Sequence, residues 1–213
     1  INTIYENTEM NDFEIRKNIH DKILFKHHQN NKTLVIDEFG LNNGDCRADI
    51  AIINGHLCGF EIKSANDNLN RLERQISFYD SVFDYSTIVV EEKHLSKIIE
   101  LVPNWWGIIL CKKGGKGDVK FTTARKSQKN NSSNPDSIVR LLWKDEIVSI
   151  LQSKGIPEKI LKQPKYKLYS LVVSIFKKEE LNKLVRTSLK ERKNWRCHKP
   201  LFQYDDLSQP FSM

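Results

Sequence analysis

Three charged residues, Asp49, Glu61 and Lys63, interrupt two hydrophobic stretches that are joined by Asn54-Gly55. The Asn-Gly pair predicts a β-hairpin with strands over residues 47–53 and 56–63. Glu61 and Lys63 share one strand face, where a carboxylate and an ammonium are costly unless they pair or bind metal. Two carboxylates suit Mg²⁺ or Mn²⁺, and a lysine beside them could stabilise charge on a phosphate. The residue types and spacing therefore indicate metal-dependent cleavage of a phosphodiester.

The hairpin loop decides whether Asp49 reaches the face of Glu61. With a two-residue Asn54-Gly55 loop, Asp49 lies opposite Phe60 and points away from Glu61. A three-residue loop, Ile53-Asn54-Gly55, or a β-bulge restores the match. The alternative interpretation is a structural Glu61–Lys63 pair, with Asp49 satisfied by turn amides. The hairpin sequence by itself leaves both interpretations open.

The elements around this hairpin follow from hydrophobic periodicity. Helices are expected over residues 11–29, 69–83 and 94–102, the first with Asp12 as N-cap and a stripe of Phe13, Ile19, Ile23 and Leu24. Further strands are expected over 33–37, 86–90, 106–110 and 119–122, the last after a hairpin loop over 112–117. The order up to residue 110 is α-β-β-β-α-β followed by α-β. This order favours an α/β fold with a mixed central sheet flanked by helices.

The second half of the chain changes character. Residues 127–137 are rich in Asn and Ser and predict a mobile linker. From residue 138 onward the pattern is helical, with breaks at Gly155-Ile-Pro157 and near Pro164. Three regions are therefore expected: an α/β domain over 1–126, a polar linker over 127–137, and a basic helical C-terminal region over 138–213.

The hairpin and its surroundings resemble the PD-(D/E)XK nuclease superfamily, which has the restriction-endonuclease-like αβββαβ core. The superfamily places an Asp on its second strand and Glu-x-Lys on its third, matched by Asp49 and Glu61-Ile62-Lys63. Ala48 stands where a Pro usually precedes the Asp. Many members carry Gln-x-x-x-Tyr on the following helix, matched by Gln75 and Tyr79, which share a helical face. The resemblance covers roughly residues 11–110, and residues 138–196 resemble more weakly a small bacterial and phage group with a helical tail.

The resemblance implies roles for these residues. Asp49, Glu61, Lys63 and Gln75 would be catalytic, and Asp49, Glu61 and Ile62 would belong to the Mg²⁺ or Mn²⁺ site. A further acidic residue completes that site in some members. Glu38 is favoured here because it lies nearer in sequence to Asp49, and Glu14 on the first helix remains the alternative.

Charge is distributed unevenly along the chain. Of the formal net charge of +7, residues 1–110 carry −6 and residues 111–213 carry +13. An acidic half that could hold metal and a basic half that could hold phosphate fit a nucleic-acid enzyme. The residues expected to contact nucleic acid are Arg71, Arg74, Tyr79, Lys112, Lys113, Lys116, Lys183, Arg186 and Lys190.

The leading hypothesis is a nuclease that acts on DNA more readily than on RNA. The alternatives are a nucleic-acid-binding module that has lost catalysis, and a partner-docking component of a defence or repair assembly. A homodimer or a larger protein assembly is compatible with either. Residues 1–10 show no signal peptide, no apolar run suits a membrane span, and the four cysteines are scattered, so a cytoplasmic location is expected.

Overall fold

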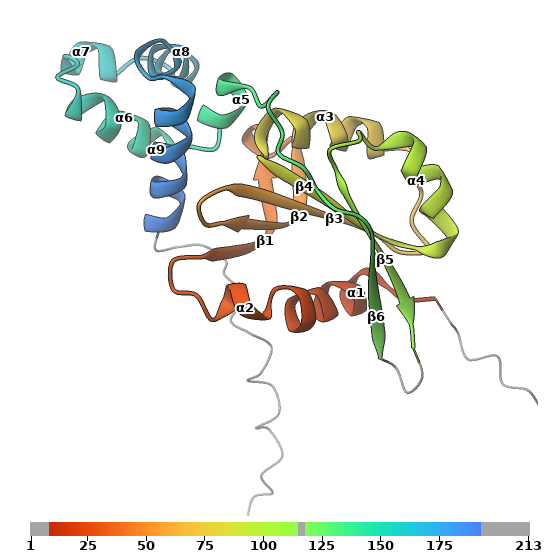
Figure 1. Ribbon diagram of the computed structural model, residues 1–213. Helices are drawn as coiled ribbons and strands as arrows, with labels where there is room; N and C mark the ends of the chain where they lie inside the picture. The colour runs from red at the N-terminus through yellow and green to blue at the C-terminus, as the bar shows by residue number, and fades with distance from the viewer. Residues whose placement is uncertain (1–8, 115–117, 193–213) are drawn as a thin grey trace, which may run out of the picture.

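A six-stranded sheet forms the centre of the computed structural model, which describes residues 9–114 and 118–192. The strands are β1 Leu34–Leu41, β2 Cys46–Ile53, β3 Leu57–Lys63, β4 Tyr85–Glu91, β5 Gly107–Lys113 and β6 Val119–Arg125. The helices are α1 Asp12–Asn18, α2 Phe25–His28, α3 Leu72–Val82, α4 Leu95–Leu101, α5 Pro135–Val139, α6 Lys144–Ser153, α7 Glu158–Leu161, α8 Lys165–Ile175 and α9 Lys178–Glu191. Helices α1 and α2 cover one face of the sheet, and α3 and α4 cover the other (Figure 1).

The sheet is mixed and its strands lie in sequence order. Strands β1, β2 and β3 pair antiparallel, β3, β4 and β5 pair parallel, and β6 returns antiparallel to β5. The parallel pairs need crossovers, which α3 and α4 supply. The expected α/β class, the element order and the mixed sheet are confirmed.

The first helical segment differs in detail from the expectation. Asn11, not Asp12, is the N-cap: its side chain accepts the Glu14 amide, and the Glu14 side chain accepts the Asn11 amide. A π-helical turn, Ile19–Ile23, then joins α1 to α2. The expected stripe is wrong at Phe13, which is 61% exposed, because Ile15 is buried with the expected Ile19 and Leu24 instead.

Helix α3 follows its sequence pattern. Leu72, Ile76, Tyr79 and Phe83 are all buried, as expected from their spacing. Gly59 on β3 allows this close packing, since a Cβ there would lie 2.6 Å from the Phe83 ring. The helix is thus held directly over the strand that carries Glu61 and Lys63.

The segment expected to be a mobile linker is instead fixed to the sheet domain. The Asn130 side chain donates to the carbonyls of Asp80 and Phe83 and is only 3% exposed. The amides of Gln128 and Asn134 donate to the carbonyls of Trp105 and Ser81. The polar residues of this segment therefore form hydrogen bonds to backbone carbonyls of the sheet domain that would otherwise lack a donor.

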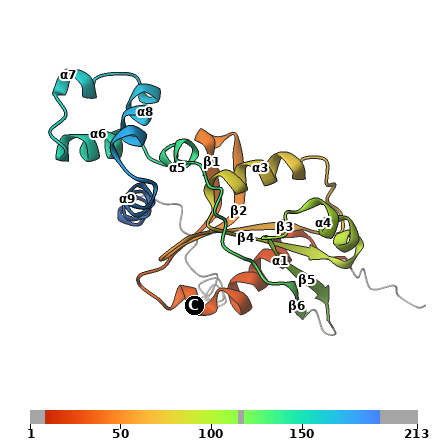
Figure 2. The ribbon, with the colours of Figure 1, turned by 45° about the horizontal axis from the view of Figure 1, so that its top comes forward.

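The helical C-terminal region shares the core of the sheet domain. Buried residues of α5, α6, α8 and α9 form one hydrophobic cluster with the residues on the α3 face of the sheet. Figure 2 shows α6, α7 and α8 grouped beyond α5, with α9 between them and the sheet. No helix among the described residues is long and apolar enough to cross a membrane.

Candidate active site

The hairpin register places Asp49 beside Glu61. Pairing of β2 with β3 starts at Ile53 and Leu57, so the loop has three residues, Asn54 to His56. The three-residue loop expected from the sequence was Ile53 to Gly55. The last pair is Ile50 with Phe60, and this register, continued by one residue, would put Asp49 opposite Glu61. The odd loop length that the sequence required is therefore present, although in a different loop, and the ladder ends before Asp49.

The two strands stop pairing where the carboxylates begin. The Ile62 amide donates to Asp49 Oδ2 at 2.7 Å instead of to a backbone carbonyl of β2. The Asp49 side chain thus ends the β2–β3 ladder, and the residues of β2 that precede Ile50 do not pair with β3. Asp49 thus lies where the two strands stop pairing, with the Ile62 amide bound to its carboxylate.

Glu61 is the centre of a buried hydrogen-bond network. Its Oε1 accepts from Lys63 Nζ at 2.6 Å and from Gln75 Nε2 at 2.5 Å, and its Oε2 accepts from Tyr79 Oη at 2.7 Å. Lys63 Nζ also donates to Gln75 Oε1 at 3.1 Å. Both Gln75 and Tyr79 come from one face of α3, one helical turn apart. The structure therefore brings the four motif residues of β3 and α3 into contact.

Arg16 of α1 is a neighbour of Asp49 that sequence reasoning missed. Its guanidinium donates to the Asp49 carbonyl at 2.7 Å, and it lies 3.3 Å from Asp49 Oδ1 and 2.8 Å from Glu38 Oε1. It also pairs with Asp12, four residues earlier. That local pair is the only signal in the sequence, and it predicts a surface ion pair on a helix rather than a contact across the fold.

Glu38 has an unusual backbone that opens β1 at this position. Its φ of 53° lies in the left-handed region. The β1–β2 ladder pairs Asp37 with Ile50 and Phe39 with Ala48 but skips Glu38 and Asp49. The Asp49 carbonyl is thereby available to Arg16. Glu14, the alternative acidic residue, is instead committed to capping α1.

Burial and the charge of Glu61 shift the pKa values of Asp49 and its neighbours. Burial, and then the nearby charge of Glu61, raise the pKa of Asp49 from 3.8 to about 8, against the opposing effects of the Ile62 amide and Arg16. Burial and Glu61 also raise the pKa of Cys46 to about 11 and the pKa of Tyr79 well above its usual value. Desolvation is the main cause of the raised pKa of Asp49.

This arrangement fits a divalent cation in its donor chemistry but not as a three-carboxylate cage. Across residues 9–114 and 118–192, no three His, Cys, Asp or Glu side chains are grouped to hold one ion. Glu38 therefore does not join Asp49 and Glu61 in a single ligand cluster. Mg²⁺ commonly takes one or two carboxylates and fills its shell with water and phosphate oxygens, so Asp49 and Glu61 meet its minimum.

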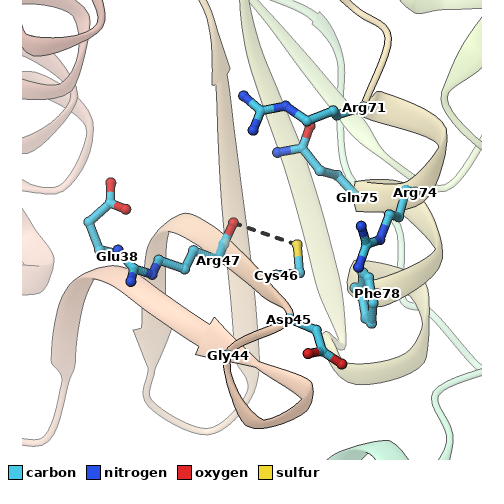
Figure 3. Close-up of a pocket in the computed structure, with 9 residues that line it drawn as sticks. All are labelled: Glu38, Gly44, Asp45, Cys46, Arg47, Arg71, Arg74, Gln75 and Phe78. Atoms are coloured by element: carbon cyan, nitrogen blue, oxygen red, sulfur yellow. Dashed lines mark hydrogen bonds between the residues drawn. The ribbon is translucent and has the colours of Figure 1, made fainter.

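A cavity of about 360 Å³ adjoins Gln75. Figure 3 shows Arg71, Arg74, Gln75 and Phe78 on its α3 side, and Glu38 with Arg47 on its strand side. The cavity thus contains both arginines that the sequence assigned to nucleic acid. Arg47 was not singled out, since an arginine that starts a strand has no special pattern.

The remaining candidates for nucleic-acid contact are Tyr79, the lysines at the end of β5 and the basic residues of α9. Tyr79 is fully buried, so the expectation of a direct nucleic-acid contact is wrong and its hydroxyl instead holds Glu61. Lys112 and Lys113 are exposed at the end of β5, with Lys112 Nζ 2.7 Å from Glu92, and Lys116 lies outside the described residues.

The three basic residues of α9 expected to bind nucleic acid, Lys183, Arg186 and Lys190, differ in their surroundings. Arg186 lies 3.9 Å from Asp84, and Lys190 donates to the Asn54 carbonyl at 2.9 Å, so both contact the sheet domain. Lys183 is exposed. The Asn54 turn is at the opposite end of β2 from Cys46. Arg186 and Lys190 therefore hold α9 against a part of the sheet domain that is distant from Asp49.

The family model described as bacteriophage P4 protein cII matches residues 5–202. The chain belongs to this P4 cII family. Protein cII of Enterobacteria phage P4 is 32% identical over 133 residues, which are 62% of this chain and 50% of that protein. This P4 cII family member therefore spans about half the length of the curated relative it matches.

A solved protein of unknown function from Silicibacter pomeroyi is also similar, with 16% identity and a TM-score of 0.37. The match covers 62% of this chain and 86% of the other.

Proposed function

We propose that this P4 cII family member is a metal-dependent nuclease of the PD-(D/E)XK type, with a restriction-endonuclease-like core. One observation supports this most strongly: the Ile62 amide, next to Glu61, donates to Asp49 where the β2–β3 ladder ends, and the Lys63 ammonium lies 2.6 Å from Glu61. These residues belong to a core with the αβββαβ order. Mg²⁺ or Mn²⁺ is the expected cofactor, and DNA is placed ahead of RNA on the resemblance alone.

Asp49 and Glu61 would hold the ion, and the amide of Ile62, the residue after Glu61, donates to Asp49. The bound ion would polarise a phosphoryl oxygen and lower the pKa of a coordinated water. Its positive charge would also favour the ionised form of Asp49, whose pKa is about 8 in the protein alone. Binding of a cation and loss of the Asp49 proton would therefore be coupled.

Lys63 and the α3 residues would orient the reacting groups. The Lys63 ammonium can stabilise negative charge that develops on the phosphate, or orient the attacking water. Gln75 and Tyr79 hold the Glu61 carboxylate through both of its oxygens, so its position is fixed before a ligand arrives. Gln75 is therefore assigned mainly to positioning, in contact with both Glu61 and Lys63.

A second candidate is a nucleic-acid-binding module without catalysis. The network supports it in one respect: Glu61 is fully engaged by Lys63, Gln75 and Tyr79, and Asp49 by Arg16 and the Ile62 amide. A scaffold role would need no more than these contacts. The two candidates differ in whether a divalent ion produces cleavage.

The test is cleavage of single-stranded, double-stranded and branched DNA and RNA by the purified chain with Mg²⁺ or Mn²⁺. Asp49→Asn and Glu61→Gln should each abolish cleavage, because they remove ligand charge while keeping shape. Lys63→Ala should also abolish cleavage but retain metal binding, since lysine is not a ligand. Glu100→Gln, at an exposed position on α4, is the matched control and should cleave like the wild type.

Melting temperature separates the two candidates for the same variants. Loss of cleavage with near-native melting supports the nuclease. Strong destabilisation by Glu61→Gln, together with wild-type protein that binds nucleic acid but cleaves nothing with either ion, would select the binding module.

A further inference from the structure

The cavity beside Gln75 is distinct from the carboxylate site but connected to it. Gln75 lines the cavity and donates to Glu61, so one residue touches both. Along α3 the lining runs from Arg71 through Arg74 and Gln75 to Phe78. The seven helical steps from Arg71 to Phe78 span about 10 Å, which is the length of one small ligand rather than of a groove along a duplex.

The walls of the cavity are positively charged. Arg47, Arg71 and Arg74 form no ion pair with an acidic residue of the described chain. The two acids of the lining are engaged elsewhere: Glu38 pairs with Arg16 at 2.8 Å, and Asp45 accepts from Asn42 at 2.7 Å. Guanidinium groups without carboxylate partners are the side chains that bind phosphate best, because their planar N–H groups match its oxygens.

The end of the cavity away from Gln75 offers a different chemistry. Phe78 is partly buried, and the Arg74 guanidinium carbon lies 5.6 Å from its ring centre. The Arg74 guanidinium thus lies over one face of the Phe78 ring. Nucleobases stack on such surfaces with little regard to sequence.

We propose that this cavity binds one unpaired nucleotide of the substrate strand, with its phosphate on Arg47 and Arg71 and its base against Phe78 and Arg74. The volume of about 360 Å³ is at the small end of ligand sites, and a duplex cannot enter it. The inference rests on the proposed function for its link to cleavage: the next phosphate along the strand would lie at Glu61. The substrate class is therefore single-stranded or locally unpaired nucleic acid.

The first test is binding without metal, so that it does not depend on catalysis. Isothermal titration in EDTA would compare dAMP, inorganic phosphate and deoxyadenosine. The wild type should bind dAMP more tightly than either part. Arg47→Ala and Arg71→Ala should each weaken dAMP by about tenfold or more, since each removes charge-assisted hydrogen bonds. Phe78→Leu should weaken dAMP but not phosphate.

The control is Lys159→Ala, which removes an equal charge from an exposed position on α7. It should bind dAMP like the wild type, and circular dichroism of every variant should match. No measurable dAMP affinity, or equal affinity in the wild type and the Arg47→Ala/Arg71→Ala double variant, would overturn the proposal. Stronger binding of phosphate than of dAMP would overturn the base contact and hence the nucleotide assignment.

The second test uses strands that carry a 5′-phosphate, a 3′-phosphate or neither, in single-stranded and blunt double-stranded form. A preference for unpaired strands that Phe78→Leu reduces supports the cavity, and dependence on one phosphate distinguishes a strand end from an internal nucleotide. Cleavage of blunt duplex equal to that of single strands, unchanged by Phe78→Leu, would refute the cavity and leave the nuclease standing. Binding of dAMP without any cleavage would refute the nuclease alone.

Discussion

Replacing Asp49 by Asn should change how stability depends on pH. In the folded protein Asp49 holds its proton up to a pKa of about 8, against 3.8 for the ordinary group. Between these values the native state binds one more proton than the unfolded chain, so the free energy of unfolding falls as pH rises. The expected slope from this group is about 1.4 kcal/mol per pH unit.

Asparagine keeps the shape of Asp49 and can still accept from the Ile62 amide, but it does not titrate. Relative to Asp49→Asn, the wild type should therefore lose about 2.7 kcal/mol between pH 5 and pH 7. Loss of the weak Arg16 contact shifts the two curves by a constant and does not alter this difference. Arg16 also retains Asp12 and Glu38 as partners.

Urea unfolding in EDTA at pH 5, 6, 7 and 8 measures the effect, with Glu100→Gln as the control that should follow the wild type. At pH 7, Mg²⁺ or Mn²⁺ should release close to one proton from the wild type and none from Asp49→Asn, which titration in buffers of different ionisation heat would detect. Parallel stability curves for the wild type and Asp49→Asn would refute the assignment of a buried, raised carboxylate.

Three further substitutions test the framework around the site. Tyr79→Phe removes the hydroxyl that donates to Glu61 and should lower the free energy of unfolding by about 1–3 kcal/mol, with cleavage reduced at unchanged metal affinity. Gly59→Ala places a Cβ against Phe83 and should cost about 1–3 kcal/mol in a urea melt, and a wild-type midpoint would contradict the close packing of α3. Arg186→Glu sets a carboxylate beside Asp84 and should lower the urea midpoint, whereas Lys183→Glu, exposed on the same helix, should not. If both α9 variants instead weaken nucleic-acid binding equally and leave stability unchanged, the tail is a phosphate-binding surface.

The sequence predicted the parts of the fold that local patterns encode. Hydrophobic periodicity placed the strands and the buried face of α3, because alternate residues must meet the same core. The spacing of Glu61 and Lys63 determined that they share a face, since strand side chains alternate. The same alternation, applied to Asp49, made its position depend on the length of the hairpin loop.

Only the tertiary structure decided the contacts that join distant segments. Arg16 reaches Asp49 because Glu38 adopts a left-handed φ and leaves a carbonyl unpaired in the ladder, and no local pattern specifies that conformation. The composition of residues 127–137 predicts a linker, yet Asn130 is buried and its side chain donates to the carbonyls of Asp80 and Phe83. The cavity of Arg47, Arg71 and Phe78 exists because β2 and α3, far apart in sequence, face each other across the end of the sheet. Sequence thus determined which groups could do chemistry, and long-range packing determined their partners.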